Sequence, residues 1–317
     1  MKRLPLVYVA GKMVAVRDAA VSIRDAALLH GLGVFETLRT YGDRPFRLAE
    51  HLARLRAGAA FLGFQVAESD ERIAEVVAEL VEANAVPDAR VRITATAGQN
   101  AAERDAPATA TLIVTAEPLA PYASDLYERG AAAVLSAIRV SEADPTLRHK
   151  TTSRARHVLA LRGAREAGAL EAIFLNSAGR VAEGTVSNVF IVRKRGQDPF
   201  SENPVRCRPK RCFRKKGPDP FFLATPPPEE GLLPGIARAT VLELAEGLAI
   251  AAAERPLTVE ELREADEVFL TNSIMEVMPV VRLEGVPVGL GRPGPVTQRL
   301  AAAYKDLVSR ETREKQA

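Results

Sequence analysis

The sequence predicts a two-domain protein of the α/β class, with helices and strands mixed along the chain (α+β). At 317 residues the chain is long enough for about two domains. Residues 46–62 carry apolar side chains every three or four positions, as an amphipathic helix does. Residues 89–97 alternate apolar and polar side chains, as a half-buried strand does. The paired prolines within residues 117–121 are typical of a short, stiff connector.

We therefore expect a smaller N-terminal domain over residues 1–116, a linker over 117–123 and a larger C-terminal domain over 124–317. The 47% hydrophobic and 26% charged residues are ordinary for a soluble globular protein. No window offers the roughly 20 apolar residues of a membrane span, and the first residues do not resemble a signal sequence, so we expect a cytoplasmic protein. With only two cysteines, neither a disulfide framework nor a metal site is expected.

The remaining elements follow the same two periodicities. In the first domain we expect a hairpin, a strand after a glycine turn, a second helix and a further strand, at residues 6–16, 34–38, 71–85 and 109–115. In the second domain we expect strands at residues 131–138, 171–176, 186–192 and 266–270. Helices are expected there at residues 152–167, 236–248 and 294–309. Residues 271–273 are expected to form a polar turn.

Residues 193–221 interrupt this order. The run RKRGQDPF at 193–200 returns as RKKGPDPF at 214–221, which indicates an insertion with a duplicated flank, placed in a surface loop. Ten Lys and Arg against two Asp and Glu give residues 193–216 a charge of +8, which leaves −5 for the rest of a chain of net +3. Such a segment could bind an acidic partner, but its Pro, Gly and charge content favours a disordered loop, and we do not expect nucleic-acid binding.

Two residues stand at the centre of the chain: Lys150 in the run RHKTT, and Glu183 in the run EGTVSN, which opens an apolar strand. In this pairing the sequence resembles the class IV aminotransferases, the fold-type IV enzymes that use pyridoxal 5'-phosphate. The resemblance implies that Lys150 forms a Schiff base with the cofactor and that Glu183 pairs with its ring nitrogen. A carboxylate there keeps the nitrogen protonated, which makes the ring an electron sink.

Other runs extend the resemblance over roughly residues 5–305, apart from the insertion. They are GLGVFET at 31–37, HLARL at 51–55, and LPGIAR with TNS at 233–238 and 271–273. The resemblance implies that the cofactor is bound by these residues in addition to the central pair: Arg54, Asn188, Gly235, Ile236, Ala237, Asn272 and Ser273. It implies that the substrate is bound by these residues: His30, Phe35, Arg39 and Arg92. A planar guanidinium at Arg54 suits a phosphate, as do the free N–H groups of a helix start after Gly235.

The sequence departs from the family at two places. The family usually has Thr or Val after the isoleucine of LPGI, and Ala237 lacks that hydroxyl, although backbone donors remain. Many relatives place a Tyr four or five residues after the lysine, where this chain has Arg154 and Ala155. The resemblance also implies a homodimer.

Three functions remain open. The first is 4-amino-4-deoxychorismate lyase, which releases pyruvate and 4-aminobenzoate; GLGVFET, ARVRI and LTNSIMEVMPV favour it slightly. The second is transamination of a branched-chain or D-amino acid, which Thr151-Thr152 after the lysine also suits. In both, Lys150 would remove the α-proton of an amino acid bound to the cofactor. The third is a catalytically silent scaffold whose basic insertion binds a partner, which the intact lysine and glutamate argue against.

Overall fold

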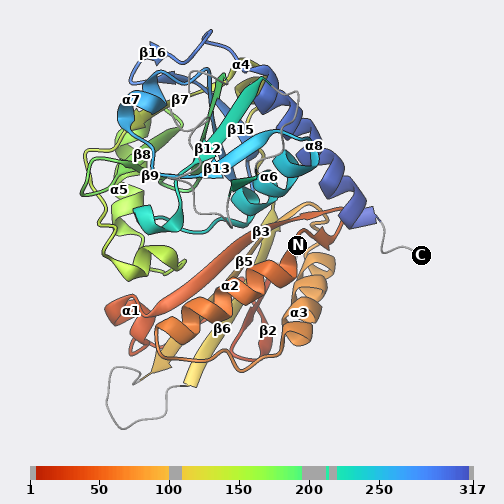
Figure 1. Ribbon diagram of the computed structural model, residues 1–317. Helices are drawn as coiled ribbons and strands as arrows, with labels where there is room; N and C mark the ends of the chain where they lie inside the picture. The colour runs from red at the N-terminus through yellow and green to blue at the C-terminus, as the bar shows by residue number, and fades with distance from the viewer. Residues whose placement is uncertain (1–4, 100–108, 195–211, 214–219, 314–317) are drawn as a thin grey trace. The chain divides into compact units, whose positions relative to one another are not determined.

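The computed structural model describes residues 5–99, 109–194, 212–213 and 220–313 (Figure 1). These residues form two compact units. Unit 1 contains the chain up to Pro121, the segment His149–Arg154 and the residues from Val308 onward. Unit 2 contains Tyr122–Arg148 and Ala155–Leu307. The chain thus returns to unit 1 twice, and Lys150 belongs to unit 1 by its contacts, although it follows the expected linker in the sequence.

Unit 1 is built on one antiparallel sheet. Its strands run in the order β2 (Lys12–Ala15), β1 (Leu6–Val9), β6 (Thr109–Pro118), β5 (Ala89–Gln99), β3 (Gly33–Tyr41) and β4 (Arg44–Pro45). The alternation predicted for residues 89–97 is confirmed, because Val91, Ile93 and Ala95 of β5 are buried whereas Arg90 and Arg92 are exposed. One face of the sheet is therefore apolar, and the other carries the arginines.

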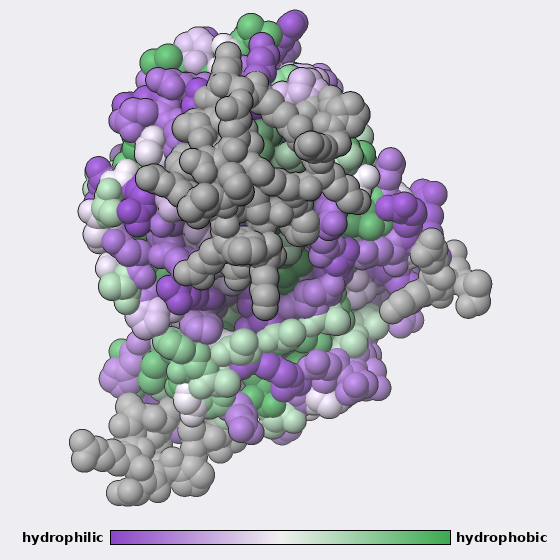
Figure 2. All heavy atoms as spheres, in the orientation of Figure 1, coloured by the Kyte–Doolittle hydropathy of each residue, from purple (hydrophilic) through white to green (hydrophobic). Residues whose placement is uncertain are grey.

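Helices α2 (Leu48–Phe61) and α3 (Asp70–Ala83) cover the apolar face of this sheet (Figure 1). Helix α3 begins where Ser69 accepts a hydrogen bond from the N–H of Arg72 and acidic residues follow in the first turn. Helix α2 buries Leu52 and Leu55, whereas Ala49, Ala53 and Ala57 are exposed. Figure 2 shows this small apolar ridge as a pale green band along α2. The short helices η1 (Val16–Asp18) and α1 (Ala26–His30) complete the unit.

Unit 2 contains the larger sheet. In its described part the strands follow the order β11 (Cys212–Phe213), β13 (Ala251–Glu254), β12 (Phe221–Thr225), β10 (Asn188–Lys194), β14 (Glu267–Asn272), β15 (Glu276–Leu283), β7 (Ala131–Leu135), β8 (Glu171–Leu175) and β9 (Val181–Gly184), with β16 (Val286–Pro287) beside β15. Buried Val, Ile and Leu side chains of β10, β14 and β8 form its core. Strand β10 lies between β12 and β14, so the EGTVSN turn that precedes it is fixed to the middle of the sheet.

The helices of this unit are α4 (Ser124–Arg129), η2 (Pro145–Arg148), α5 (Ala155–Glu166), η4 (Pro228–Glu230), α6 (Ile236–Gly247), α7 (Val259–Arg263) and α8 (Pro295–Arg313). Glu267 fixes the start of α8, because its buried carboxylate accepts hydrogen bonds from the N–H groups of Val296 and Thr297. The last residues of α8, from Val308, belong to unit 1.

Several predicted boundaries differ from the structure. Strand β7 ends at Leu135 rather than at residue 138. Helix α5 starts at Ala155 rather than at residue 152, because the preceding residues pair with β3. Thr271 and Asn272, expected in a turn, are the last residues of β14, where Thr271 pairs with Val277 of β15.

Most of the basic insertion expected at residues 193–221 lies outside the described residues. Of that segment, Arg193 and Lys194 end β10, Cys212–Phe213 form β11, and Phe221 starts β12. In the described part of the chain, no helix is long and apolar enough to cross a membrane.

Candidate functional site

Lys150 lies on a short extended segment that adds to the edge of β3. The carbonyl of Lys150 accepts a hydrogen bond from the N–H of Phe35 at 2.9 Å, and the N–H of Thr152 donates to the carbonyl of Gly33 at 2.8 Å. Thr151 pairs with Val34 in the same antiparallel bridge. The backbone that carries the lysine is therefore fixed to the GLGVFET strand, although the two segments lie far apart in the sequence.

The Phe35 side chain brings two cations together. The Lys150 Nζ lies 5.0 Å from the centre of the Phe35 ring, and the Arg92 guanidinium carbon lies 3.8 Å from it. Arg39, on the same strand as Phe35, lies 4.2 Å from the Tyr41 ring centre. These side chains give unit 1 a cationic face beside Lys150, which suits a carboxylate.

A buried carboxylate organises the predicted phosphate ligand. Glu36 is fully buried and accepts hydrogen bonds from Arg54 Nε at 2.7 Å and Arg54 Nη2 at 2.6 Å. Its Oε2 is also 2.7 Å from His51 Nδ1. Burial opposes the charged form of Glu36, but the Arg54 charge and the hydrogen bonds from Arg54 and His51 lower its pKa to about 2. Since the carboxylate is ionised, Nδ1 of His51 carries the proton. Burial is also the largest influence on His51 and lowers its pKa.

Glu183 occupies a buried position at the start of the EGTVSN run of unit 2. Its Oε2 accepts a hydrogen bond from the N–H of Leu233 at 2.9 Å, and its Oε1 lies 3.8 Å from His157 Nε2. The His157 ring packs edge-on against Phe174, at 5.3 Å between centres. Glu183 is therefore held by one backbone donor and lies beside one histidine, which fixes where its carboxylate points.

A second buried carboxylate, Glu171 of β8, shapes the same turn. It accepts hydrogen bonds from the N–H groups of Thr185 and Val186 and from the hydroxyls of Thr185 and Ser187. Burial is the largest influence and raises the pKa of Glu171, although these donors act in the opposite direction. Glu171 thus fixes the turn that positions Asn188.

The start of α6 provides a close backbone approach. A Cβ at Gly235 would overlap the Asn188 Oδ1, so a larger residue there would have to displace the Asn188 side chain. The Asn188 amide donates to the carbonyl of Leu233 at 2.9 Å. No side chain caps the first turn of α6, which leaves the N–H groups of Ile236 and Ala237 in the position that suits an anion.

The TNS run lies beside this region in the sheet. The Asn272 Nδ2 donates to the carbonyl of Val186 at 3.0 Å, and its Oδ1 accepts from the N–H groups of Ile274 and Met275 at 2.8 Å. The Asn272 side chain therefore ties together two turns. Among the described residues, the buried Thr271 Oγ1 has no hydrogen-bond partner. A buried hydroxyl of this kind suits a polar ligand.

Within unit 1 the structure brings Lys150, Phe35 and Arg92 together and pairs Arg54 with Glu36. Within unit 2 it brings together Glu183, Asn188 and Gly235 around Leu233. His30 ends α1 as an exposed residue. Sequence reasoning missed Glu36, His51, Glu171 and His157 as parts of these networks. Glu36 lies in the GLGVFET run and His51 in the HLARL run. A charged or polar residue at a core position of a predicted strand or helix is the feature that could have identified them.

The donor set fits pyridoxal 5'-phosphate. Unit 1 offers a lysine amine, which suits the cofactor aldehyde, and a guanidinium, which suits a phosphate. Unit 2 offers a buried carboxylate, which suits a ring nitrogen, and an uncapped helix start, which suits an anion. The buried, partnerless Thr271 hydroxyl and the glycine cradle at Gly235 support the fit. Among the described residues, no group of three or more His, Cys, Asp or Glu could hold a metal ion.

The fold and these networks define an enzyme of the pyridoxal-phosphate type. A family profile described as amino-transferase class IV matches residues 33–283. A putative branched-chain-amino-acid aminotransferase of Methanocaldococcus jannaschii is 33% identical over 306 residues, which cover 95% of this chain and 96% of that protein. An aminodeoxychorismate lyase of Bacillus subtilis is 30% identical over 98% of this chain and 97% of that protein. The chain belongs to the class IV aminotransferase family.

Solved structures agree with this assignment. The crystal structure of the Escherichia coli branched-chain amino acid aminotransferase superposes with a TM-score of 0.83 at 29% identity, covering 99% of this chain and 98% of that one. The branched-chain amino acid aminotransferase of Thermobaculum terrenum, in its PLP-form, gives a TM-score of 0.79 at 25% identity, covering 99% and 97%. The predicted fold-type IV architecture and the predicted cofactor, pyridoxal 5'-phosphate, are confirmed.

Proposed function

We propose that this enzyme transfers the amino group of an amino acid with an apolar side chain to a 2-oxo acid. One observation carries the proposal: the Lys150 amine and the Arg92 guanidinium lie over the same Phe35 ring. An arginine in that place can bind the substrate carboxylate while the lysine remains close to the α-carbon. The branched-chain aminotransferases among the relatives support an apolar side chain.

Each of these residues has a separate role in the proposed reaction. When bound, pyridoxal 5'-phosphate supplies an aldehyde that captures the amino group and a ring that accepts the electrons left at the α-carbon. Lys150, as a neutral amine, removes the α-proton. Glu183 keeps a proton on the ring nitrogen, and Arg54, with the N–H groups of Ile236 and Ala237, binds the phosphate.

Other residues complete the proposed substrate and cofactor sites. Phe35 supplies an apolar wall beside Lys150, while Arg39 and His30 are the other substrate ligands we propose. Asn188, Gly235, Asn272 and Ser273 complete the cofactor ligands. We also propose that the enzyme is a cytoplasmic homodimer, as the family resemblance implies.

The second candidate is 4-amino-4-deoxychorismate lyase. The runs GLGVFET, ARVRI and LTNSIMEVMPV favour it, and the Bacillus subtilis lyase is similar over nearly the whole chain. In this reaction the same α-proton is removed by Lys150. The bond to the pyruvate portion then breaks, and the ring becomes aromatic, so one substrate molecule gives one 4-aminobenzoate and one pyruvate.

A single-turnover experiment separates the candidates. Enzyme loaded with pyridoxal 5'-phosphate is mixed with individual L- and D-amino acids without an acceptor, and the visible spectrum and 2-oxo acid yield are recorded. A transaminase converts the cofactor to its pyridoxamine form and releases one 2-oxo acid per site. An unchanged spectrum with every amino acid, together with pyruvate and 4-aminobenzoate from aminodeoxychorismate, identifies the lyase. A cofactor band that persists in Lys150→Ala would overturn both.

A further inference from the structure

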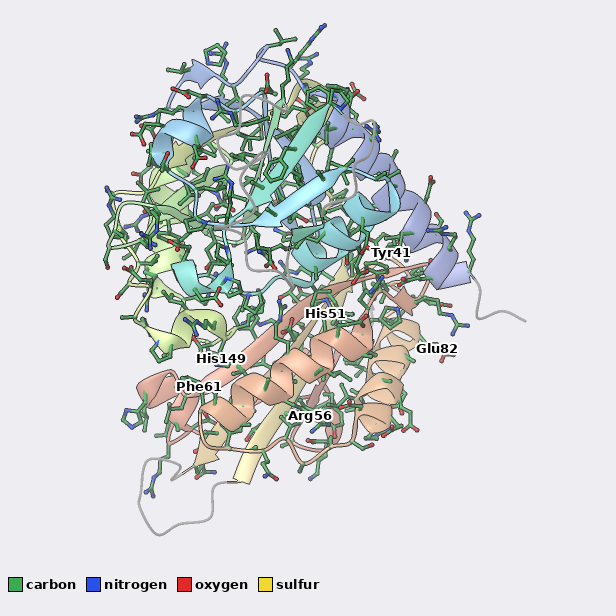
Figure 3. All side chains as sticks on the ribbon, in the orientation of Figure 1. Tyr41, His51, Arg56, Phe61, Glu82 and His149 are labelled. Carbon is green, nitrogen blue, oxygen red and sulfur yellow. The ribbon has the colours of Figure 1, made fainter. Side chains whose placement is uncertain are left out.

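Helix α2 carries one proposed cofactor ligand, Arg54, and contacts the residue that precedes another, Lys150. Arg54 lies in its middle, paired with Glu36, and Phe61 is its last residue. The Phe61 ring stacks on the ring of His149, the residue just before Lys150, with 4.1 Å between centres and 18° between planes. Figure 3 shows Phe61 and His149 side by side at this end of the helix. One rigid helix thus touches the residue that leads into Lys150 and also holds Arg54.

We propose that the Phe61–His149 stack is a positioning device that sets the place of Lys150 relative to Arg54. This inference rests on the proposed function, in which Lys150 binds the aldehyde and Arg54 the phosphate of one cofactor molecule. Phe61 and His149 are positioning residues, because they act through Lys150 and α2 rather than by touching the substrate.

The backbone around the stack is closely packed. A Cβ at Gly58 would lie 3.0 Å from Val34 Cγ1 and 3.8 Å from the His149 Cβ. Gly58 therefore lets α2 approach both β3 and the lysine segment, one helical turn after Arg54. A larger residue would move the helix away from one of them.

The hydrogen bonds to β3 fix only one side of the lysine segment. They restrain Lys150 and Thr152 through the backbone of Phe35 and Gly33. The stack restrains the segment through a side chain, from α2. Phe61 stays 43% exposed, so it contributes less to the core than a buried ring does, and its main contact of this kind is with His149. Together the two restraints fix both the direction and the distance of Lys150.

This arrangement makes a specific prediction about cofactor binding. A ligand that binds Lys150 and Arg54 at the same time gains affinity from the fixed distance between them, whereas a ligand that binds only one of the two does not. Pyridoxal 5'-phosphate uses both Lys150 and Arg54. Pyridoxal, which lacks the phosphate, uses only Lys150. Loss of the stack should therefore weaken the phosphate-bearing ligand selectively.

The test measures the dissociation constants of both ligands for the cofactor-free protein, from the visible absorption band that each forms with Lys150. We expect Phe61→Ala and His149→Ala to lower the ratio of pyridoxal to pyridoxal 5'-phosphate dissociation constants by about tenfold or more, because misplacement by about 1 Å is costly in this way. Phe61→Tyr and His149→Phe keep two stacked rings and should keep the ratio. Ile23→Ala, another exposed apolar residue of unit 1, is the matched control.

The outcomes are distinct. A lowered ratio in the alanine variants, with the ring-conserving variants like wild type, supports the positioning role. An unchanged ratio would overturn the positioning role, and so would equal weakening of the binding of both ligands, since a general loss of packing affects both alike. Thermal unfolding of each variant shows whether packing has been lost. If the wild type forms no Lys150-dependent band with either ligand, the proposed function itself fails, and this inference fails with it.

Discussion

Glu36 and Arg54 are joined by two parallel hydrogen bonds, Nε to Oε1 at 2.7 Å and Nη2 to Oε2 at 2.6 Å, around a carboxylate with no exposed surface. The pair holds the guanidinium in one plane. It also means that the proposed phosphate ligand is oriented before any phosphate arrives, which lowers the ordering cost of binding.

Replacing Glu36 with Gln should lower the free energy of unfolding at pH 7 by about 3–5 kcal/mol, because Arg54, whose side chain is only 13% exposed, would lose its counter-charge. The pKa of Glu36 is lowered from 4.5 to about 2, so its contribution is present above pH 4.5 and is lost as the pH falls toward 2. The difference in free energy of unfolding between wild type and Glu36→Gln, measured by urea unfolding, should therefore become smaller as the pH falls from 4.5 to about 2. Glu117→Gln, in an exposed pair with Arg90, should cost less than about 1 kcal/mol. A constant gap would contradict the prediction.

Gly235→Ala should weaken the binding of pyridoxal 5'-phosphate by about tenfold or more, since the added Cβ must displace Asn188 at the start of α6. Gly247→Ala, at the other end of the same helix, meets no atom within 4 Å and should raise stability by about 0.5–1 kcal/mol. Cofactor titration and thermal unfolding measure the two effects. Equal cofactor affinity in both variants would show that the Gly235 cradle is not needed.

Glu171 should make stability fall as the pH rises. Burial raises its pKa above 4.5, so the folded protein binds this proton more tightly than the unfolded chain, and stability decreases above pH 4.5. Glu171→Gln cannot titrate, so the free energy of unfolding of wild type minus that of the variant should decrease between pH 4.5 and pH 8. A difference that grows with pH would refute this assignment.

Arg47 and Glu311 should stabilise unit 1 by a salt-sensitive pair. Arg47 donates to both carboxylate oxygens of Glu311, at 2.8 and 3.0 Å, and both residues line a groove of about 1150 Å³ in that unit. A double-mutant cycle of Arg47→Ala and Glu311→Ala should give a coupling of about 1 kcal/mol that falls with added salt. The exposed Arg72–Glu75 pair of α3 should give about 0.3 kcal/mol in the same experiment. Zero coupling for the first pair would exclude a stabilising role.

The sequence predicted much of this fold because local periodicity determined it. The alternation of β5 and the apolar spacing of α2 each reflect one buried face, so both elements could be placed from residues alone. The pairing of Thr151 with Val34 could not, since it joins segments far apart in the sequence. For the same reason the sequence alone did not assign Lys150 to the unit that its contacts define: periodicity shows where an element lies in sequence, not which sheet it completes.

Only part of the candidate site could be predicted from the sequence. Motif resemblance identified Lys150, Arg54 and Glu183, because each stands in a recognisable run of residues. Glu36 and Glu171 were missed as organising groups, because a buried carboxylate is distinguished from a surface one only by the donors that surround it. Those donors come from α2 and from the turn before β10, and their convergence is a property of the folded chain.

The return of residues 149–154 to the edge of β3 has a consequence for biosynthesis. Translation makes β3 early, but the segment that pairs with Gly33 and Phe35 leaves the ribosome only after residues 122–148 of the other unit. Until then the nascent chain presents an unsatisfied strand edge, which favours association with other chains or with a chaperone. An N-terminal fragment ending at Pro121 would keep that edge permanently, so a recombinant version should be more soluble when residues 149–154 are supplied in the same polypeptide.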